Sequence, residues 1–312
     1  LIAPYIVWLI SRPIKKQSPD FTTKQQYLLH RIARKTWYFF ETFVTAKENW
    51  LPPDNFQEVP VPVIASRTSP TNIGLALLAN LSAYDLGYLS AGKMLERTQL
   101  MFTTMSRLKR YKNHFYNWYD THTLKPLFPL YVSSVDSGNL AGHLLTLGQG
   151  IRELKKTPVY QPDIFSGLLD TVQVIKEYAL QNKLLLQLET DLEANPQTLQ
   201  KAFALLRSIS IQIDRTVETF DSNQAELQKW GQTLKDNCQD HLNELLYIAP
   251  WLQILYTWPD EPMGEDVAFI FGQMEALDQT LTLQDITELE KSLCPLIESA
   301  LTGLTDEEPN PL

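Results

Sequence analysis

Residues 111–147 hold the side chains best suited to chemistry, because aromatic rings alternate there with carboxylates, amides and hydroxyls. A sugar presents apolar C–H faces and many hydroxyl groups, so proteins bind it with flat rings flanked by polar side chains. The residue types in this stretch match that requirement. We therefore predict that a sugar contacts this stretch. The candidate residues are the rings of Phe115, Tyr116, Trp118 and Tyr119, the interleaved Asn117 and Asp120, and the later pair Asp136 and Asn139.

Asp120 and Asp136 also have the residue type that glycoside chemistry needs. Such reactions use two carboxyl groups, about 5–5.5 Å apart when the anomeric configuration is retained and farther apart when it is inverted. A self-contained inverting glycosidase is therefore one hypothesis. The structural alternative is that Asp120 closes an Asx-turn and Asp136 caps the following helix. The sequence leaves both hypotheses open.

The segment between the rings and Asp136 is predicted to be irregular. Pro126 and Pro129 exclude a continuous helix across residues 121–132. Residues 133–137 then supply capping side chains ahead of a leucine-rich run, which predicts a helix start. Polar groups and rings are thus expected at a helix N-terminus.

A second predicted helix start lies earlier in the chain. Ser69 followed by Pro70 indicates an N-cap and the first helical position, and Gly87 is suited to close the helix. Arg67 and Asn72 lie at the entrance of this helix, where free backbone N–H groups favour anions and hydroxyls.

Apolar residues recur at helical spacing through most of the remaining chain. The pattern predicts an all-α protein whose second half is a helical scaffold with charged and glutamine-rich faces. A proline-rich extended loop is expected around residues 50–62, and Pro295 predicts a break in the last helix. The other predicted helices cover residues 23–47, 92–108, 164–181, 197–220, 225–255 and 283–301.

The composition excludes several kinds of partner. A formal net charge of -9 argues against nucleic acid, because phosphate binding needs a basic face. Cys238 and Cys294 are too few and too far apart for a disulfide framework or a metal knuckle. The five histidines lack metal-ligand spacing, so we predict no metal site.

The first ten residues, LIAPYIVWLI, are almost wholly apolar and are followed by Arg12, Lys15 and Lys16. Ten residues are too short for a bilayer, which needs about 20. We interpret residues 1–22 as the end of a transmembrane helix with a basic linker, which places the following residues in the cytoplasm. The alternative is a short buried or interfacial segment.

Four runs of the sequence occur in order: LPPDNFQE, RTSPTNIGLALL, HFYNWYDT and YVSSVDSGNLAGHL. Together they resemble the central region of the cyclic β-1,2-glucan synthases, very large membrane enzymes with three activities in one chain. The resemblance is dense over residues 50–152 and thinner over the rest.

The resemblance implies that residues 23–155 form the first helical hairpins of a glucoamylase-like (α/α)6 barrel, which cyclises linear β-1,2-glucan by transglycosylation. Residues 156–303 would be a long-helix insertion, and residues 304–312 a linker or a truncated edge. The catalytic glutamates would lie outside this chain, so we expect it to be inactive alone. No metal ion or organic cofactor is implied. The implied sugar-cleft residues are Trp118, Tyr119, Asp120, Asp136 and Asn139, with Arg67, Thr68 and Asn72 as neighbours.

The implied partners are a β-1,2-glucan, the remaining domains of the same polypeptide, and the membrane through the N-terminal segment. The implied location is the cytoplasmic side of the inner membrane. The alternative hypothesis is a non-catalytic helical module that docks or spaces other domains. That alternative requires Trp118, Asp120 and Asp136 to be buried in internal contacts, whereas sugar binding requires them to be open to a concave face.

Overall fold

The computed structural model describes residues 2–11, 20–158, 160–161, 163–179, 182–194, 196–257 and a few single positions between 278 and 291. Within these residues the chain is helical, and its sheets are three pairs of two-residue strands. The prediction of an all-α fold is therefore confirmed. The predicted helix 283–301 and the predicted linker 304–312 fall outside the described residues, apart from single positions in the helix.

The first helical group contains four helices whose starts are set by hydroxyl N-caps. The side chain of Ser69 caps one of them, with Pro70 at its first position as predicted, and Ser133 caps another. The helices are α2 (Thr23–Phe43), α3 (Pro70–Asp85), α4 (Ala91–Arg107) and α5 (Ser134–Glu153).

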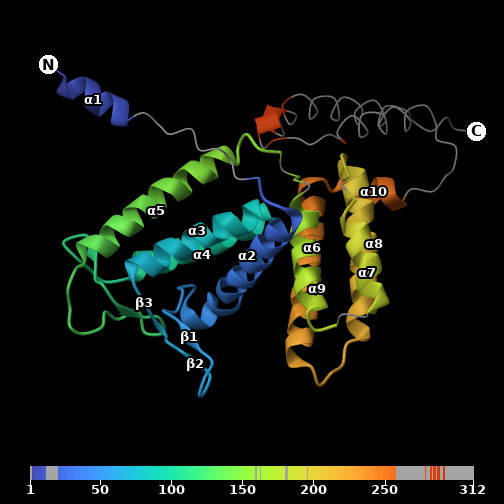
Figure 1. Cartoon of the computed structure of the whole chain (residues 1–312), viewed down its shortest axis with the longest axis horizontal. Coiled ribbons are helices and arrows are strands. Elements are labelled where there is room, and N and C mark those ends of the chain that lie inside the picture. The colour runs from blue at the N-terminus through green and yellow to red at the C-terminus, as the bar shows by residue number, and fades with distance from the viewer. Residues whose placement is uncertain are drawn as a thin grey trace, which may run out of the picture.

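Helices α3 and α4 form an antiparallel hairpin, in which Gly87 has a φ of +71° that favours glycine. Helices α3 and α5 instead run parallel (Figure 1). Their contacts advance together along both chains: Gly74 faces His143, and Gly150 faces Leu81. The N-termini of α3 and α5 therefore lie side by side.

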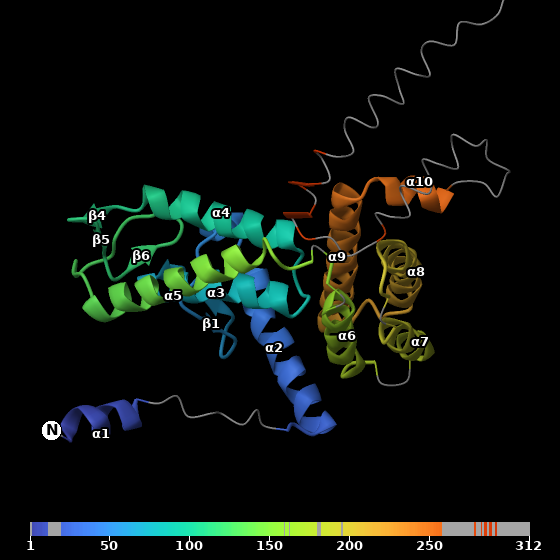
Figure 2. The same cartoon turned by 90° about the horizontal axis from the view of Figure 1, so that it is seen from above.

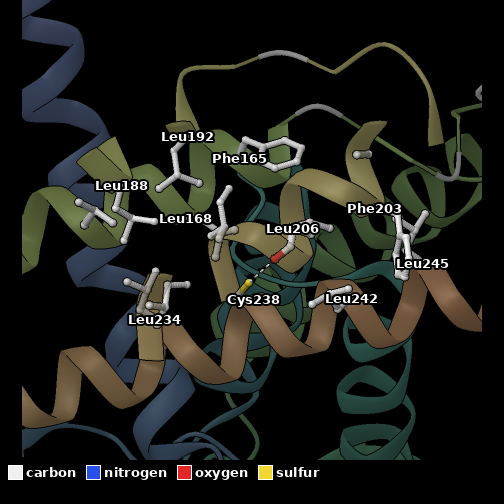
Figure 3. Packing of buried hydrophobic residues seen from close by; sticks show 14 of the residues in the cluster. Phe165, Leu168, Leu188, Leu192, Phe203, Leu206, Leu234, Cys238, Leu242 and Leu245 are labelled. Carbon is white, nitrogen blue, oxygen red and sulfur yellow. Dashed lines mark hydrogen bonds between the residues drawn. The ribbon is translucent and has the colours of Figure 1, made fainter. Parts of the chain in front are cut away.

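The second helical group surrounds a larger apolar core. Its buried residues include Phe203, Leu206, Leu242 and Cys238, whose thiol lies 3.8 Å from the carbonyl oxygen of Leu206 (Figure 3). The helices are α6 (Asp163–Lys176), α7 (Lys183–Leu192), α8 (Leu199–Glu218), α9 (Ala225–Ile248) and α10 (Trp251–Thr257).

The prediction of one helix over residues 225–255 was wrong. Helix α9 ends at Ile248, and α10 begins at Trp251, because Pro250 cannot continue the backbone hydrogen bonds of a helix. The sequence analysis also missed α7, which is capped by the side chain of Asn182.

A buried arginine joins the two helical groups. Arg34 of α2 is fully buried, and its Nε donates to the hydroxyl of Thr171 in α6 at 2.8 Å. Its Nη2 lies 3.0 Å from Glu41, and its guanidinium packs on the rings of Tyr88 and Trp230. The charge is thus compensated by a carboxylate and two aromatic faces.

Close backbone packing joins the same groups at a second place. A Cβ atom on Gly167 of α6 would come within 2.2 Å of the carbonyl oxygen of Gly87. The same carbonyl lies 3.0 Å from Nε2 of the buried His241 in α9. The proposed boundary between residues 155 and 156 stays a prediction.

Helix α1 (Ala3–Ile10) is apolar and has no buried residue. No helix within the described part of the chain is both long and apolar enough to cross a membrane. The interpretation of residues 1–22 as the end of a membrane helix stays a prediction.

Short strands link the proline-rich loop to the central stretch. In the pair that we call the β3–β6 ribbon, Arg67 lies opposite Asp120 and Thr68 lies opposite Tyr119. Figure 2 shows β4, β5 and β6 at the end of the first group where α5 begins. The short elements are η1 (Ala46–Glu48), β1 (Phe56–Gln57), β2 (Val63–Ile64), β3 (Arg67–Thr68), β4 (Arg110–Tyr111), β5 (His114–Phe115) and β6 (Tyr119–Asp120).

Candidate functional site

Asp136 lies in the first turn of α5, beside the first turn of α3. The cap of α5 is Ser133, so the structural alternative that made Asp136 the cap was wrong. The Asp136 carboxylate instead reaches across to α3 and accepts a hydrogen bond from Thr71 Oγ1 at 2.6 Å. Asn139 Nδ2 donates to the same hydroxyl at 3.1 Å, so Asp136 and Asn139 share Thr71.

Asp136 is held in its ionised form. Burial raises the pKa of its carboxyl, but hydrogen bonds from Ser133 and Thr71 outweigh burial and leave the pKa below its ordinary value. The adjacent N-termini of two parallel helices favour a negative charge at the same place. Asp136 is therefore suited to accept hydrogen bonds from hydroxyl groups.

Asn117 connects Asp136 to Trp118. The amide of Asn117 satisfies both of its atoms when its nitrogen donates to Asp136 Oδ2 at 2.8 Å and its oxygen accepts from Trp118 Nε1 at 2.8 Å. The same oxygen accepts from the hydroxyl of Tyr131 at 2.7 Å. The half-buried Trp118 ring is therefore fixed in orientation.

Arg67 and Asn72 converge on Asp54, a residue of the proline-rich loop. The guanidinium of Arg67 binds Asp54 Oδ2 through Nη2 at 3.0 Å and Nε at 3.3 Å, and Asn72 donates to Asp54 Oδ1 at 3.2 Å. The guanidinium also lies 5.0 Å from the centre of the Trp118 ring. We call this contact the Arg67–Trp118 stack.

Asp120 closes an Asx-turn, as the structural alternative predicted. Its Oδ1 accepts from the backbone N–H of His122 at 3.1 Å, and from the N–H and hydroxyl of Thr123 at 2.7 and 2.9 Å. The N–H of Thr123 is the main cause of a pKa below the ordinary value. A general acid needs a raised pKa. Because the pKa values of both Asp120 and Asp136 are lowered, the pair is poorly suited to an inverting glycosidase.

Tyr119 and Thr68 were expected in or beside the sugar cleft, but both side chains are fully buried. The hydroxyl of Tyr119 donates to the carbonyl of Lys109 at 2.7 Å and accepts from the N–H of Tyr116 at 2.8 Å. Burial raises the pKa of Tyr119 to about 12. Both residues belong to the core under the ribbon, where a ligand has no access to the Tyr119 ring.

Glu48 is a site residue that the sequence analysis missed. It is 2% exposed, and its carboxylate accepts from the hydroxyls of Ser66, at 3.1 Å, and Thr121. It also pairs with His122 Nε2 at 2.9 Å. Burial raises the pKa of Glu48, but these hydrogen bonds outweigh it and lower the pKa. Glu48 thereby holds both strands of the β3–β6 ribbon, and no local sequence signal distinguishes it from exposed charges nearby.

We compared the chain with known protein families and with characterised proteins. No family model matches it. It is, however, similar to a cyclic β-1,2-glucan synthase, which confirms the predicted resemblance. The relative is the cyclic β-(1,2)-glucan synthase NdvB of Rhizobium meliloti (strain 1021), with 41% identity over 177 residues. The matched stretch is 56% of this chain and 6% of the length of NdvB.

Proposed function

We propose that this chain supplies part of the glucan-binding surface of a cyclic β-1,2-glucan synthase, within the domain that cyclises the linear glucan by transglycosylation. The observation that carries the proposal is the connected group formed by Arg67, Trp118, Asn117, Asp136 and Asn139. It combines a fixed aromatic ring with an ionised carboxylate and amide groups at a partly open surface. The similarity to NdvB supports the substrate class.

In this proposal the chain binds and orients glucose units. The Trp118 ring offers a flat face to the C–H groups of a sugar, and Asp136 and Asn139 offer an acceptor and an amide to its hydroxyls. Cleavage of the glucan and attack by its own 2-hydroxyl end would use glutamates outside this chain, with retention of configuration. The site would lie on the cytoplasmic side of the inner membrane, next to the other domains of the polypeptide.

The alternative of a purely non-catalytic scaffold is less well supported. It requires Trp118 and Asp136 to be consumed by internal contacts. Both side chains are instead half-buried, so the Trp118 ring and the Asp136 carboxylate remain partly open to solvent. This partial exposure favours a ligand.

Calorimetric titration of the chain with linear β-1,2-gluco-oligosaccharides tests the proposal. We expect saturable binding without turnover, and loss of binding in Asp136→Asn and Trp118→Ala. Asp236→Asn and Tyr247→Ala are matched controls, because both side chains are exposed on α9, away from the site. Circular dichroism checks that each variant is folded.

Three outcomes separate the hypotheses. Binding that survives both site variants would place the ligand elsewhere. A folded chain that does not bind the oligosaccharides would favour the scaffold. Turnover by the parent chain would support the hypothesis of a self-contained glycosidase. It would contradict the proposal that this chain only binds the glucan and that the catalytic glutamates lie outside it.

A further inference from the structure

A hollow of about 550 Å³ lies between the β1–β2 hairpin and the β3–β6 ribbon. This volume falls within the range of small-molecule sites, about 300–1,000 Å³. Its apolar lining residues are Val63, Ala65 and Leu127. Its polar lining residues include Gln57, together with Arg67 and Asp120 of the ribbon.

The ribbon places a free donor and a free acceptor at this hollow. Arg67 and Asp120 are directly opposite in the antiparallel register, so their side chains share one face of the ribbon. Asp54 occupies Nε and Nη2 of Arg67, while Nη1 makes no hydrogen bond to any described residue. Asp120 Oδ1 holds its Asx-turn, and Oδ2 has no partner within the same residues.

The charge balance of the hollow selects a neutral ligand. The single guanidinium of Arg67 is already paired with Asp54 and faces a second carboxylate, Asp120. A phosphate or carboxylate ligand would therefore meet no net positive charge. A pyranose ring fits better, because its C–H groups suit the apolar lining residues and its hydroxyls suit the Arg67 donor and the Asp120 acceptor.

We propose that the hollow is a second glucose-binding subsite, which holds further units of the glucan bound at Trp118 and Asp136. This inference rests on the proposed function. The Arg67–Trp118 stack supports it, because Arg67 lines the hollow while Trp118 is connected through Asn117 to Asp136. A chain of glucose units crossing this stack would contact both subsites, so affinity would rise with the length of the oligosaccharide.

Calorimetry with β-1,2-linked oligosaccharides of increasing length tests the second subsite. Gln57→Ala removes a polar group from the hollow, and Ala65→Leu fills the hollow with an apolar side chain. We expect Gln57→Ala to weaken binding of long oligosaccharides about fivefold, the effect of one lost hydrogen bond. Ala65→Leu should weaken the same binding because its side chain occupies the space of the sugar, and both variants should leave the disaccharide unaffected. Gln99→Ala, on the exposed surface of α4, is the matched control.

The outcomes distinguish the second subsite from the proposed function. If the parent binds short and long oligosaccharides equally and the two variants match it, the subsite is refuted while the function stands. If the parent binds no oligosaccharide, both fail. Equal losses for short and long ligands would overturn the division into two subsites. Competition by inorganic phosphate, lost in Gln57→Ala, would overturn the assignment to a neutral sugar.

Discussion

Glu48→Ala removes the buried carboxylate that holds both strands of the β3–β6 ribbon. A hydrogen bond to a charged group contributes about 1.5–3 kcal/mol to the free energy of unfolding. The three partners, Ser66, Thr121 and His122, contribute unequally to this free energy. The His122 side chain is 46% exposed, so after the substitution it can form hydrogen bonds with water instead. The Thr121 side chain is fully buried and would keep an unpaired hydroxyl. We therefore expect a loss of about 3–4 kcal/mol in the free energy of unfolding.

Urea denaturation followed by tryptophan fluorescence measures this loss. Glu96→Ala is the matched control, because the Glu96 side chain is 56% exposed and its ion pair among the described residues is an i,i+3 pair with Lys93. The control is expected to change the free energy of unfolding by less than about 0.5 kcal/mol. A loss below about 1 kcal/mol in Glu48→Ala would refute the assignment of Glu48 as the support of the ribbon.

The same variant makes a pH prediction. The pKa of Glu48 in the folded protein lies below its ordinary value of 4.5. A lowered carboxyl pKa contributes stability above the unfolded pKa, and this contribution is lost as the pH falls through the folded pKa. The difference in unfolding free energy between parent and Glu48→Ala should therefore be full at neutral pH and should shrink below about pH 4.5.

Three further predictions concern buried positions in the second helical group. Gly167→Ala should lower the free energy of unfolding, measured in urea, by at least about 2 kcal/mol, because its Cβ would meet a backbone carbonyl at 2.2 Å. The control is Gly148→Ala in α5, where a Cβ meets open space, and it should raise the free energy of unfolding by about 0.5–1 kcal/mol. Burial lowers the pKa of His241 to about 4, so as the pH falls the unfolded chain takes up a proton at this residue before the folded chain does. The free energy of unfolding should therefore fall by up to about 1.4 kcal/mol for each unit that the pH is lowered from about 6.5 to 4. His241→Gln should remove this contribution. Burial raises the pKa of the Cys238 thiol to about 12 and shields it from reagents, so iodoacetamide should modify it only in denaturant. Mass spectrometry measures the modification, and modification of the native chain would contradict the burial of Cys238.

Local signals made the helix starts predictable. The cap at Ser69 and the turn at Gly87 each depend on a few neighbouring residues, so the sequence alone located them. For α5 the sequence located the helix start within residues 133–137 but did not single out Ser133 as the cap. Helix periodicity was a weaker guide. It extended one helix across Pro250 and missed the short helix α7.

The candidate site was only partly predictable, because its contacts join residues far apart in the chain. Thr71 and Asp136 are 65 positions apart, and Glu48 and Thr121 are 73 apart. Residue type was enough to suggest Trp118 and Asp136 as sugar contacts. It does not show which of the neighbouring rings points into the core, so the buried Tyr119 was predicted as a contact as well. Whether the group binds sugar stays a prediction for the titrations above.

The fully buried Arg34 limits how the chain can be divided. Its guanidinium belongs to α2, but the hydroxyl that it bonds, on Thr171, and one of the rings that it packs on, Trp230, belong to the second group. Separating the groups would take the Thr171 hydroxyl and the Trp230 ring away from Arg34 and would uncover the apolar surface of α2, such as Tyr38, that packs on the core of the second group. A truncation after α5 should therefore yield an insoluble or unfolded product, and the two groups should respond to applied force as one mechanical unit.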